Sequence, residues 1–345
     1  MTAETRPTVS PPLPWRRWLP AVAVCGAVLL AFAVGQYPVG PGELLAALRA
    51  RLTGGESGLS PAVETVIWQI RLPRVVAALA VGAALAAAGG AYQSLFRNPL
   101  VSPDLLGVSA GASLGAILGI VLAQPVLVIQ ALAFAGGLAA VALVYLIGSA
   151  LRGHDPVLQL VLTGIAVGAM LSAAISLLKV LADPYDQLPA ITYWLLGSLA
   201  AVGPDDMLAL LPACLLGLLP LWLFRWRMNL LTLGEEEAKA LGLETRRLRL
   251  LFIAGATLMT AASVAVAGLV GWVGLLVPHV ARMLVGPDFT RLLPASLLLG
   301  AGFLLVLDTL ARTVAAVEVP LGILTACLGA PFFLWLMALG RRGWT

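Results

Sequence analysis

The sequence predicts an all-α polytopic membrane protein with about ten transmembrane helices. Of its 345 residues, 60% are hydrophobic and 11% are charged, whereas a soluble domain is roughly a quarter charged. Apolar runs long enough for a spanning helix, about 20 residues, alternate with short polar segments along the chain. The 36 glycines suit helices that approach one another closely in a bilayer.

The apolar runs and their breaks set the expected boundaries. We expect residues 1–17 to be a cytoplasmic tail and residues 18–342 to form a single transmembrane domain. A short helix at Gly42–Leu52 and an interfacial segment at Tyr193 and Trp194 should interrupt the polar loops. The membrane helices are expected at about 18–36, 68–93, 104–122, 126–150, 157–181, 205–224, 249–270, 273–285, 291–313 and 321–340.

The basic residues predict that both chain ends lie in the cytoplasm, because cytoplasmic loops carry an excess of Lys and Arg. We therefore interpret the net charge of +4 as a topology signal, not as a nucleic-acid-binding surface. Fifteen cations fall inside: Arg6, Arg16, Arg17, Arg97, Arg152, Arg225, Arg227, Lys239, Arg246, Arg247, Arg249, Arg282, Arg291, Arg341 and Arg342. Six fall at or near the outer face: Arg49, Arg51, Arg71, Arg74, Lys179 and Arg312.

Glycine recurs at every fourth position of the third run. The four residues are Gly107, Gly111, Gly115 and Gly119. Such a stripe leaves one helix face bare and predicts tight packing on a neighbouring helix. Ser109 and Ser113 form a second stripe, which either lines a polar path or bonds back to its own helix.

Leu231–Leu250 is the longest charged segment of the second half of the chain, and it lies between two apolar runs. Its charges would be costly in hydrocarbon, so it must lie in water. Helix-forming residues from Glu237 to Leu241, closed by Gly242, predict a short amphipathic helix. This loop, about 227–248, is either a solvated connector or a docking element for a soluble partner.

Four charged residues stand out near membrane helices. Asp308 and Arg312 are four apart and share a helix face, so they can pair. An intramembrane pair suggests a proton or substrate site of a secondary transporter, whereas placement at the outer end would expose Arg312. Arg71 and Arg74 can snorkel to the outer interface or meet an acidic protein partner.

The sequence carries no ATP-binding motif and no metal-ligand spacing. A P-loop needs lysine after glycine, and neither Lys179 nor Lys239 follows one. Gly107-Val108-Ser109-Ala110-Gly111 matches Gly-x-Ser-x-Gly, but no strand precedes it, and only His154 and His279 could assist the serine. The three cysteines, Cys25, Cys214 and Cys327, lie in apolar runs, and their spacing fits no metal site. Taken together, these observations lead us to expect no metal, no bound cofactor and no catalysis by this chain.

Several motifs, in order, resemble the FecCD-type permeases of ABC importers, which serve iron siderophores, vitamin B12, haem and molybdate. The resemblance covers nearly all of the chain from Arg71 to Pro331. The matches are Arg71-Leu72-Pro73-Arg74, Arg97-Asn98-Pro99-Leu100-x-x-Pro103-x-x-x-Gly107, Trp194-Leu195-Leu196-Gly197-Ser198, Glu237-Ala238-x-x-x-Gly242, Gly271-Trp272-Val273-Gly274-Leu275-x-x-Pro278-His279-x-x-Arg282, Asp308-x-x-Ala311-Arg312 and Glu318-x-Pro320-x-Gly322-x-x-Thr325-Ala326.

The resemblance implies a type II ABC importer permease in the bacterial inner membrane, surrounded by lipid. A second copy of the chain, a cytoplasmic ATPase dimer and a periplasmic or lipid-anchored binding protein would be its partners, with ATP and Mg²⁺ on the ATPase. By the same resemblance, the coupling helix holds Glu237, Ala238, Leu241 and Gly242; the inner gate holds Asn98, Pro99 and Leu100; and the binding protein docks on Arg71, Arg74 and Arg312.

The substrate expected from the resemblance is a metal chelate, because iron-chelate permeases dominate the family. The segments Leu188–Trp194 and Trp226–Leu231 look more like the molybdate branch, so molybdate or tungstate stays an alternative, as do cobalamin and haem. A hypothesis of another class is a stand-alone secondary transporter that works through Asp308.

Overall fold

The computed structural model describes residues 19–35, 37–150, 156–233 and 235–339. The expected tail at 1–17 and the end of the expected domain at 340–342 lie outside these ranges. Every regular element in the described ranges is helical: α1 (Leu19–Ala33), α2 (Pro41–Thr53), α3 (Pro61–Thr65), η2 (Val66–Arg71), α4 (Leu72–Leu95), η3 (Pro103–Leu106), α5 (Val108–Val121), α6 (Val126–Ala150), α7 (Pro156–Leu181), α8 (Gln187–Leu196), α9 (Pro204–Leu223), α10 (Arg225–Leu231), α11 (Glu235–Ala240), α12 (Thr245–Ala267), α13 (Val273–Val285), α14 (Phe289–Ala311) and α15 (Leu321–Leu339).

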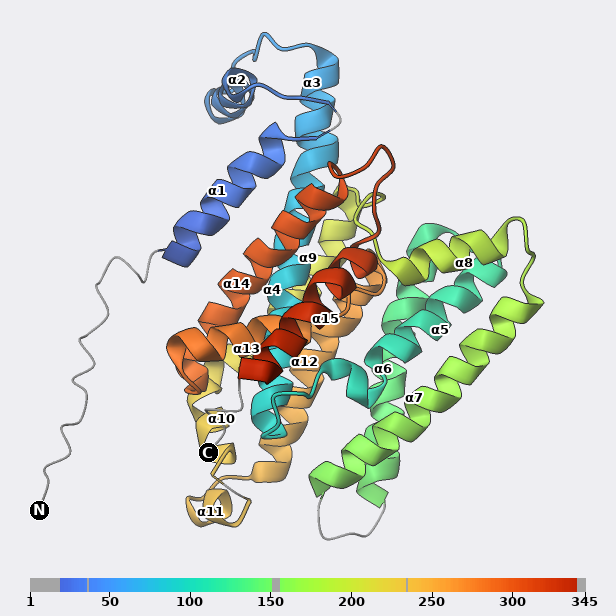
Figure 1. The fold of residues 1–345 in the computed structure, drawn as a ribbon, viewed down its shortest axis with the longest axis vertical. Helices are drawn as coiled ribbons and strands as arrows, with labels where there is room; N and C mark the ends of the chain where they lie inside the picture. The colour runs from blue at the N-terminus through green and yellow to red at the C-terminus, as the bar shows by residue number, and fades with distance from the viewer. Residues whose placement is uncertain (1–18, 36, 151–155, 234, 340–345) are drawn as a thin grey trace, which may run out of the picture.

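The helix content confirms the predicted all-α polytopic fold. By length and composition, six of the described helices can cross a membrane, and four further apolar helices are shorter. The helices run up and down in one bundle, with α2 and α3 beyond one end and α11 beyond the other (Figure 1). Since the positive-inside rule puts the α11 end in the cytoplasm, α2 and α3 lie on the outer side.

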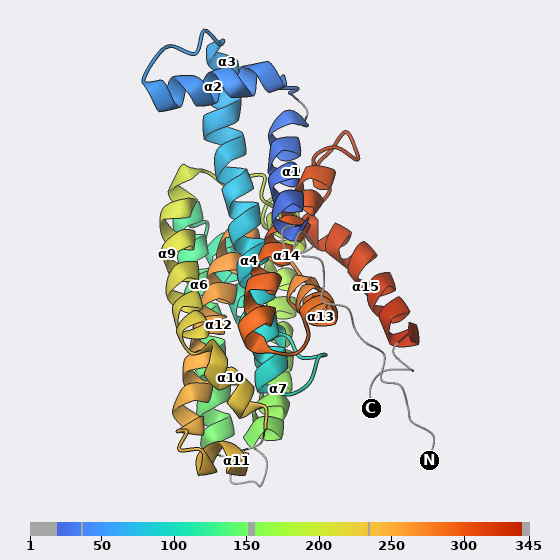
Figure 2. The ribbon, with the colours of Figure 1, turned by 90° about the vertical axis from the view of Figure 1, so that its left-hand side faces the viewer.

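The helix predicted at about 68–93 extends further outward than expected. A continuous helix runs from Pro61 through the π-helical turn η2 to Leu95. At 1.5 Å per residue it is about 50 Å long, well beyond the hydrocarbon thickness of about 30 Å. Its outer part packs with α2 in a small separate core that contains Ala47, Val63 and Ile67. Figure 2 shows α2 lying across the top of this helix.

Helix α4 is the centre of the bundle. It contacts α14, α12, α13 and α9, and ten of its 19 buried residues are alanine or glycine. A Cβ at Gly82 would overlap the carbonyl oxygen of Gly300 in α14, and a Cβ at Gly89 would overlap that of Gly274 in α13. Small residues therefore let the backbones of α4, α13 and α14 touch.

The glycine stripe of the third run is divided in two. Gly111, Gly115 and Gly119 lie in α5, and a Cβ at any of them would press on α6. Gly107 instead precedes α5 with φ of +78°, and a Cβ there would make only ordinary contacts. The predicted helix at about 104–122 is therefore interrupted, because Gly107 takes a left-handed conformation between η3 and α5.

We predict that Gly115→Ala lowers the stability of the purified protein in detergent by about 1–3 kcal/mol, because the new Cβ would overlap the carbonyl oxygen of Leu132 in α6. Thermal unfolding followed by circular dichroism measures this. The matched control is Gly26→Ala in α1, where no described atom lies within 4 Å of the Cβ position. Equal melting temperatures for the two variants would contradict the packing role.

Candidate functional site

A buried cluster of charges joins the outer ends of several elements. Arg74 in α4 donates from Nε to both carboxylate oxygens of Asp308 in α14, at 2.9 and 3.1 Å. Its two terminal nitrogens donate to the two carboxylate oxygens of Glu318, at 2.9 and 2.7 Å. Arg74 is only 7% exposed and Asp308 is fully buried. Ser198, in the loop after α8, donates to Glu318 at 3.1 Å.

The arginines predicted to dock a binding protein all have partners within the chain. Arg312, at the outer end of α14, lies 3.3 Å from Asp308 and donates to the carbonyl oxygens of Ala31 and Val34 at the end of α1. Arg71, 4% exposed, donates to the carbonyl oxygens of Phe32 and Tyr37. Cations at a helix C-terminus satisfy carbonyls that have no partner in the helix.

In this chain the three arginines therefore hold α1, α4 and α14 together, and docking on them stays a prediction. Asp308 and Arg312 form the expected pair, at the outer end of the helix and not in its middle. Arg312 is not exposed there, because α1 covers it: its side chain is 10% accessible. The sequence could not indicate the contact with α1, because the acceptors are backbone carbonyls.

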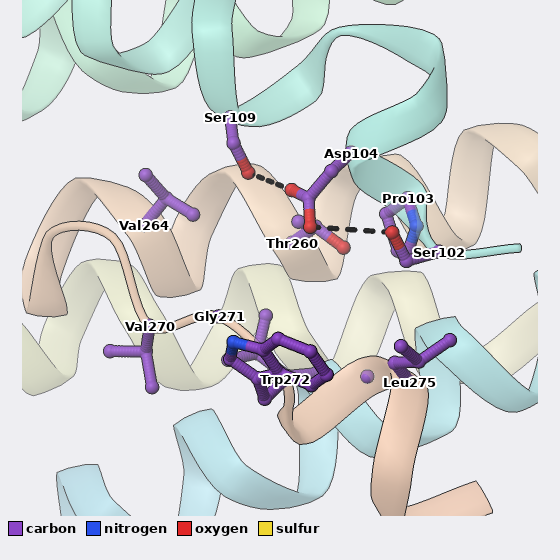
Figure 3. Close-up of a pocket in the computed structure, with 12 residues that line it drawn as sticks. Ser102, Pro103, Asp104, Ser109, Thr260, Val264, Val270, Gly271, Trp272 and Leu275 are labelled. Carbon is purple, nitrogen blue, oxygen red and sulfur yellow. Dashed lines mark hydrogen bonds between the residues drawn. The ribbon is translucent and has the colours of Figure 1, made fainter. Parts of the chain in front are cut away.

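A cavity of about 260 Å³, lined by polar and apolar residues, lies beside Leu85 near the middle of α4. One wall is Asp104 in η3, which accepts hydrogen bonds from Ser109 and, at 3.4 Å, from Ser102. The indole of Trp272 forms the opposite wall (Figure 3). Thr260 of α12 also lines the cavity. A carboxylate, hydroxyls and an aromatic ring together suit a ligand that offers hydrogen-bond donors or positive charge.

Two interrupted helices create this cavity. Helix α5 begins directly after Gly107, and α13 begins directly after Trp272, whose φ of +68° is rare for a bulky residue. The Trp272 ring is held by α15, where Gly329 leaves room for it and Phe333 packs at 6.3 Å between ring centroids. Helix ends within the membrane, gathered round a polar cavity, are typical of transporter substrate sites.

The residues expected at the inner gate form the loop that leads from α4 to this cavity. The side chain of Asn98 accepts from the backbone N–H of Leu100 at 2.9 Å, which closes a tight turn. Asn98 and Leu100 are exposed, and Pro99 is half-buried. The loop continues through Ser102 into Asp104, so the gate segment and the cavity wall are one stretch of chain.

The expected coupling helix is α11. Ala238 is fully buried against the core, whereas Leu241 is 60% exposed and Glu237 is also exposed. Gly242, with φ of +79°, closes the helix: its N–H bonds to the carbonyl of Lys239, and that of Leu243 bonds to the carbonyl of Ala238. The chain thus fixes α11 by one face and presents the other to the cytoplasm.

Helix α10 connects this end of the bundle to α14. Asn229 donates to Asp288 at 2.6 Å and accepts from the backbone N–H of Phe289 at 2.8 Å. Asp288 also accepts from Thr290 and caps α14. The hydrogen bonds from Asn229 and Thr290 favour the charged form and lower the pKa of the Asp288 carboxyl below its ordinary value. A displacement of α10 would therefore also move the start of α14.

Sequence reasoning missed the cavity. Asp104 falls at an unspecified position of its motif, and Thr260 belongs to no motif. Trp272 and Asn229 lie within segments quoted for the family resemblance, so the sequence did indicate these positions. It did not indicate what either side chain does. Of the two serines in the second stripe, Ser109 reaches the cavity, whereas Ser113 bonds back to the carbonyl of Ser109.

The Gly-x-Ser-x-Gly match at Gly107–Gly111 would suggest an intramembrane serine protease, and that hypothesis gains no support from this cavity. The described residues that line it include no histidine. The hydroxyl of Ser109 donates to Asp104. His154 lies outside the described ranges.

We expect Asp308→Asn to lower the stability in detergent by about 3–5 kcal/mol, because Arg312 would lose its ion pair with Asp308 and Arg74 would keep the carboxylate of Glu318 alone. Chemical denaturation followed by tryptophan fluorescence measures the change. Asp183→Asn, in an exposed outer loop, is the matched control. If both variants unfold at the same denaturant concentration, the cluster is not a major source of stability.

Comparison with known proteins gives one consistent answer. The FecCD transport family matches residues 22–338. The chain is 43% identical to the "Probable iron chelatin transport system permease protein" of Helicobacter pylori over 80% of this chain and 83% of that protein. It is 38% identical to the molybdate import system permease protein MolB of Haemophilus influenzae over 91% and 93%.

A solved structure agrees with these relatives. An ABC transporter assigned to the metal-chelate type, in an inward-facing conformation, superposes with a TM-score of 0.85 at 35% identity, covering 94% of this chain and 99% of that one. The chain is a multi-pass membrane permease and belongs to the FecCD transport family.

Proposed function

We propose that this chain is the permease of a binding-protein-dependent ABC importer that moves an iron chelate into the cytoplasm by ATP-driven alternating access. Two copies would form the pore in a bacterial inner membrane, with an ATPase dimer below and a binding protein above. The observation that carries the proposal is α11: Ala238 fixes the helix by its buried side, and the exposed Leu241 directly after the helix offers an apolar contact to a soluble partner.

A route from the ATPase to the pore supports alternating access. Helix α11 is followed by α12, which lines the cavity through Thr260, and is preceded by α10, which is bonded to α14. Pushing on α11 would therefore move both helices relative to α4. Such a push shifts the equilibrium between outward-open and inward-open states only if the ATPase binds the two states with different affinity.

The cavity chemistry supports a chelate over an oxyanion. Molybdate and tungstate are dianions, and the carboxylate of Asp104 would repel them across so small a space. An iron chelate instead offers amide, hydroxyl or ammonium groups that Asp104 and Ser109 can bind. Since one subunit encloses about 260 Å³, a whole chelate would extend into the matching cavity of the second copy.

The alternative of a secondary transporter finds no support in the charge cluster. Asp308 is fully buried and its charge is balanced by Arg74 and Arg312. A carboxylate that binds and releases a proton or an ion during transport needs a changing partner and access to solvent. The placement of Asp308 suits a structural ion pair.

We predict that Leu241→Ser reduces recovery of the ATPase by at least about ten-fold when the tagged chain is purified from its native membrane, because an exposed apolar anchor is lost. Partner recovery is measured by quantitative mass spectrometry. Leu52→Ser, at a leucine that is 78% exposed on the outer side, should leave it unchanged. Full recovery of the ATPase with Leu241→Ser would refute the coupling role of α11.

For the substrate, we predict that cells whose only permease of this family is this chain take up a ⁵⁵Fe-labelled trihydroxamate chelate and not labelled molybdate. Asp104→Asn should slow iron uptake several-fold, because the carboxylate that faces the chelate is lost. Asp183→Asn serves as the control. If the cells take up molybdate in a manner that depends on this chain and take up no iron, the proposed substrate is wrong and the chain carries the oxyanion.

A further inference from the structure

An apolar groove of about 760 Å³ lies on the outside of the bundle, between α6, α9 and α12. Only Tyr145 and Thr257 bring hydroxyls to its lining, and Thr257 is already paired with Tyr92 at 3.1 Å. The leucines along it are open to the surroundings: Leu146 is 65% exposed, Leu219 52% and Leu223 57%. The groove therefore faces the hydrocarbon of the bilayer.

The groove belongs to the cytoplasmic half of the membrane. Its α9 wall ends at Leu223, the last residue of that helix, and its α12 wall begins at Leu250, close to the start of that helix. Both of these ends are at the cytoplasmic side. Figure 2 shows α6, α9 and α12 side by side on one flank of the bundle, with α10 and α11 below them.

Guanidinium groups lie at the inner end of this groove. Arg247 precedes Leu250 and Leu251 by three and four residues, so it lies on the groove face of α12 one turn nearer the cytoplasm. Arg227 in α10 lies over the ring of Phe224, a lining residue, at 5.0 Å from the ring centroid. The side chain of Arg247 is 84% exposed.

The surroundings of these two arginines match the headgroup region. Arg225 lies over the ring of Trp222 at 4.5 Å, and Arg227 also contacts Trp226 at 5.2 Å. Trp222 and Trp226 are 42% and 51% exposed, and tryptophan is enriched where chains meet the membrane surface. Glu244 pairs with Arg247 at 2.8 Å, so the three arginines keep a net positive charge.

From this arrangement we propose that the groove binds an anionic phospholipid of the inner leaflet. Its acyl chain lies between α6, α9 and α12, and its phosphate contacts Arg227 and Arg247. The apolar lining accounts for the acyl chain, and the guanidinium groups of Arg227 and Arg247 account for a preference by headgroup charge, because basic clusters at the cytoplasmic ends of membrane helices attract anionic lipids. This site shares no lining residue with the polar cavity, and its arginines border α11.

Native mass spectrometry of the delipidated full-length protein tests the proposal, with phosphatidylglycerol and phosphatidylcholine of identical acyl chains as probes. We expect phosphatidylglycerol to bind preferentially. The double variant Arg227→Gln/Arg247→Gln should lose this preference by at least about five-fold, since each guanidinium near a membrane surface contributes about that factor. Arg49→Gln/Arg51→Gln, with both changes on the outer helix α2, should keep it.

A second variant distinguishes the groove from its rim. Leu219→Trp fills the groove and should weaken binding of both lipids equally, with the headgroup preference of any residual binding unchanged. Equal binding of the two lipids by the unaltered protein would overturn the proposal. So would an unchanged preference in the Arg227→Gln/Arg247→Gln variant that melts at the same temperature as the parent.

Discussion

The ion pairs that Arg74 makes with Asp308 and Glu318 join most of the outer end of this molecule. They connect α4 to α14 and to the segment that leads into α15, and Ser198 extends the network to the loop after α8. A buried ion pair is stable only when both charges are matched and further hydrogen bonds are present. Here Arg312 supplies a second positive charge beside Asp308, and Ser198 donates a further hydrogen bond to Glu318. The positions of α1, α4, α14 and α15 at this end therefore depend on one another.

At the level of the cavity the constraint is different, because helices stop within the membrane. Backbone groups at such ends need partners or water, so interrupted helices persist only beside a polar space or within packed protein. Near the start of α5 the hydroxyl of Ser109 donates to the carboxylate of Asp104, and at the start of α13 the Trp272 ring packs against Gly329. The polar cavity and the irregular backbone are thus consequences of each other.

The two ends of α14 contact different parts of the protein. Its inner end is capped by Asp288 and Asn229 and is thereby joined to α10, which contacts α11. Its outer end carries Asp308, in the charge cluster. In the proposed importer, α14 would carry movement at the ATPase side to the outer side.

Much of the fold could be predicted from the sequence because hydrocarbon imposes simple rules on the chain. Apolar runs and the distribution of arginine predicted the membrane helices and their orientation, and the bounds of α6 and α13 agree with those expected. The Glu237–Gly242 segment predicted a short helix with a glycine end, because both features are local. Gly107 was misassigned to a helix, since its spacing matched the stripe although its conformation does not.

What the sequence determined, then, is the set of local properties: which segments cross the membrane, which way they face, and which family they belong to. The tertiary structure alone decided the partners. In the folded chain, Arg71 and Arg312 donate hydrogen bonds to carbonyl oxygens at the end of α1. Arg74 pairs with Asp308 and Glu318, and Trp272 lies across the cavity from Asp104. These contacts join residues far apart in the chain, and several use backbone atoms that every residue carries, so no pattern of side chains could have specified them.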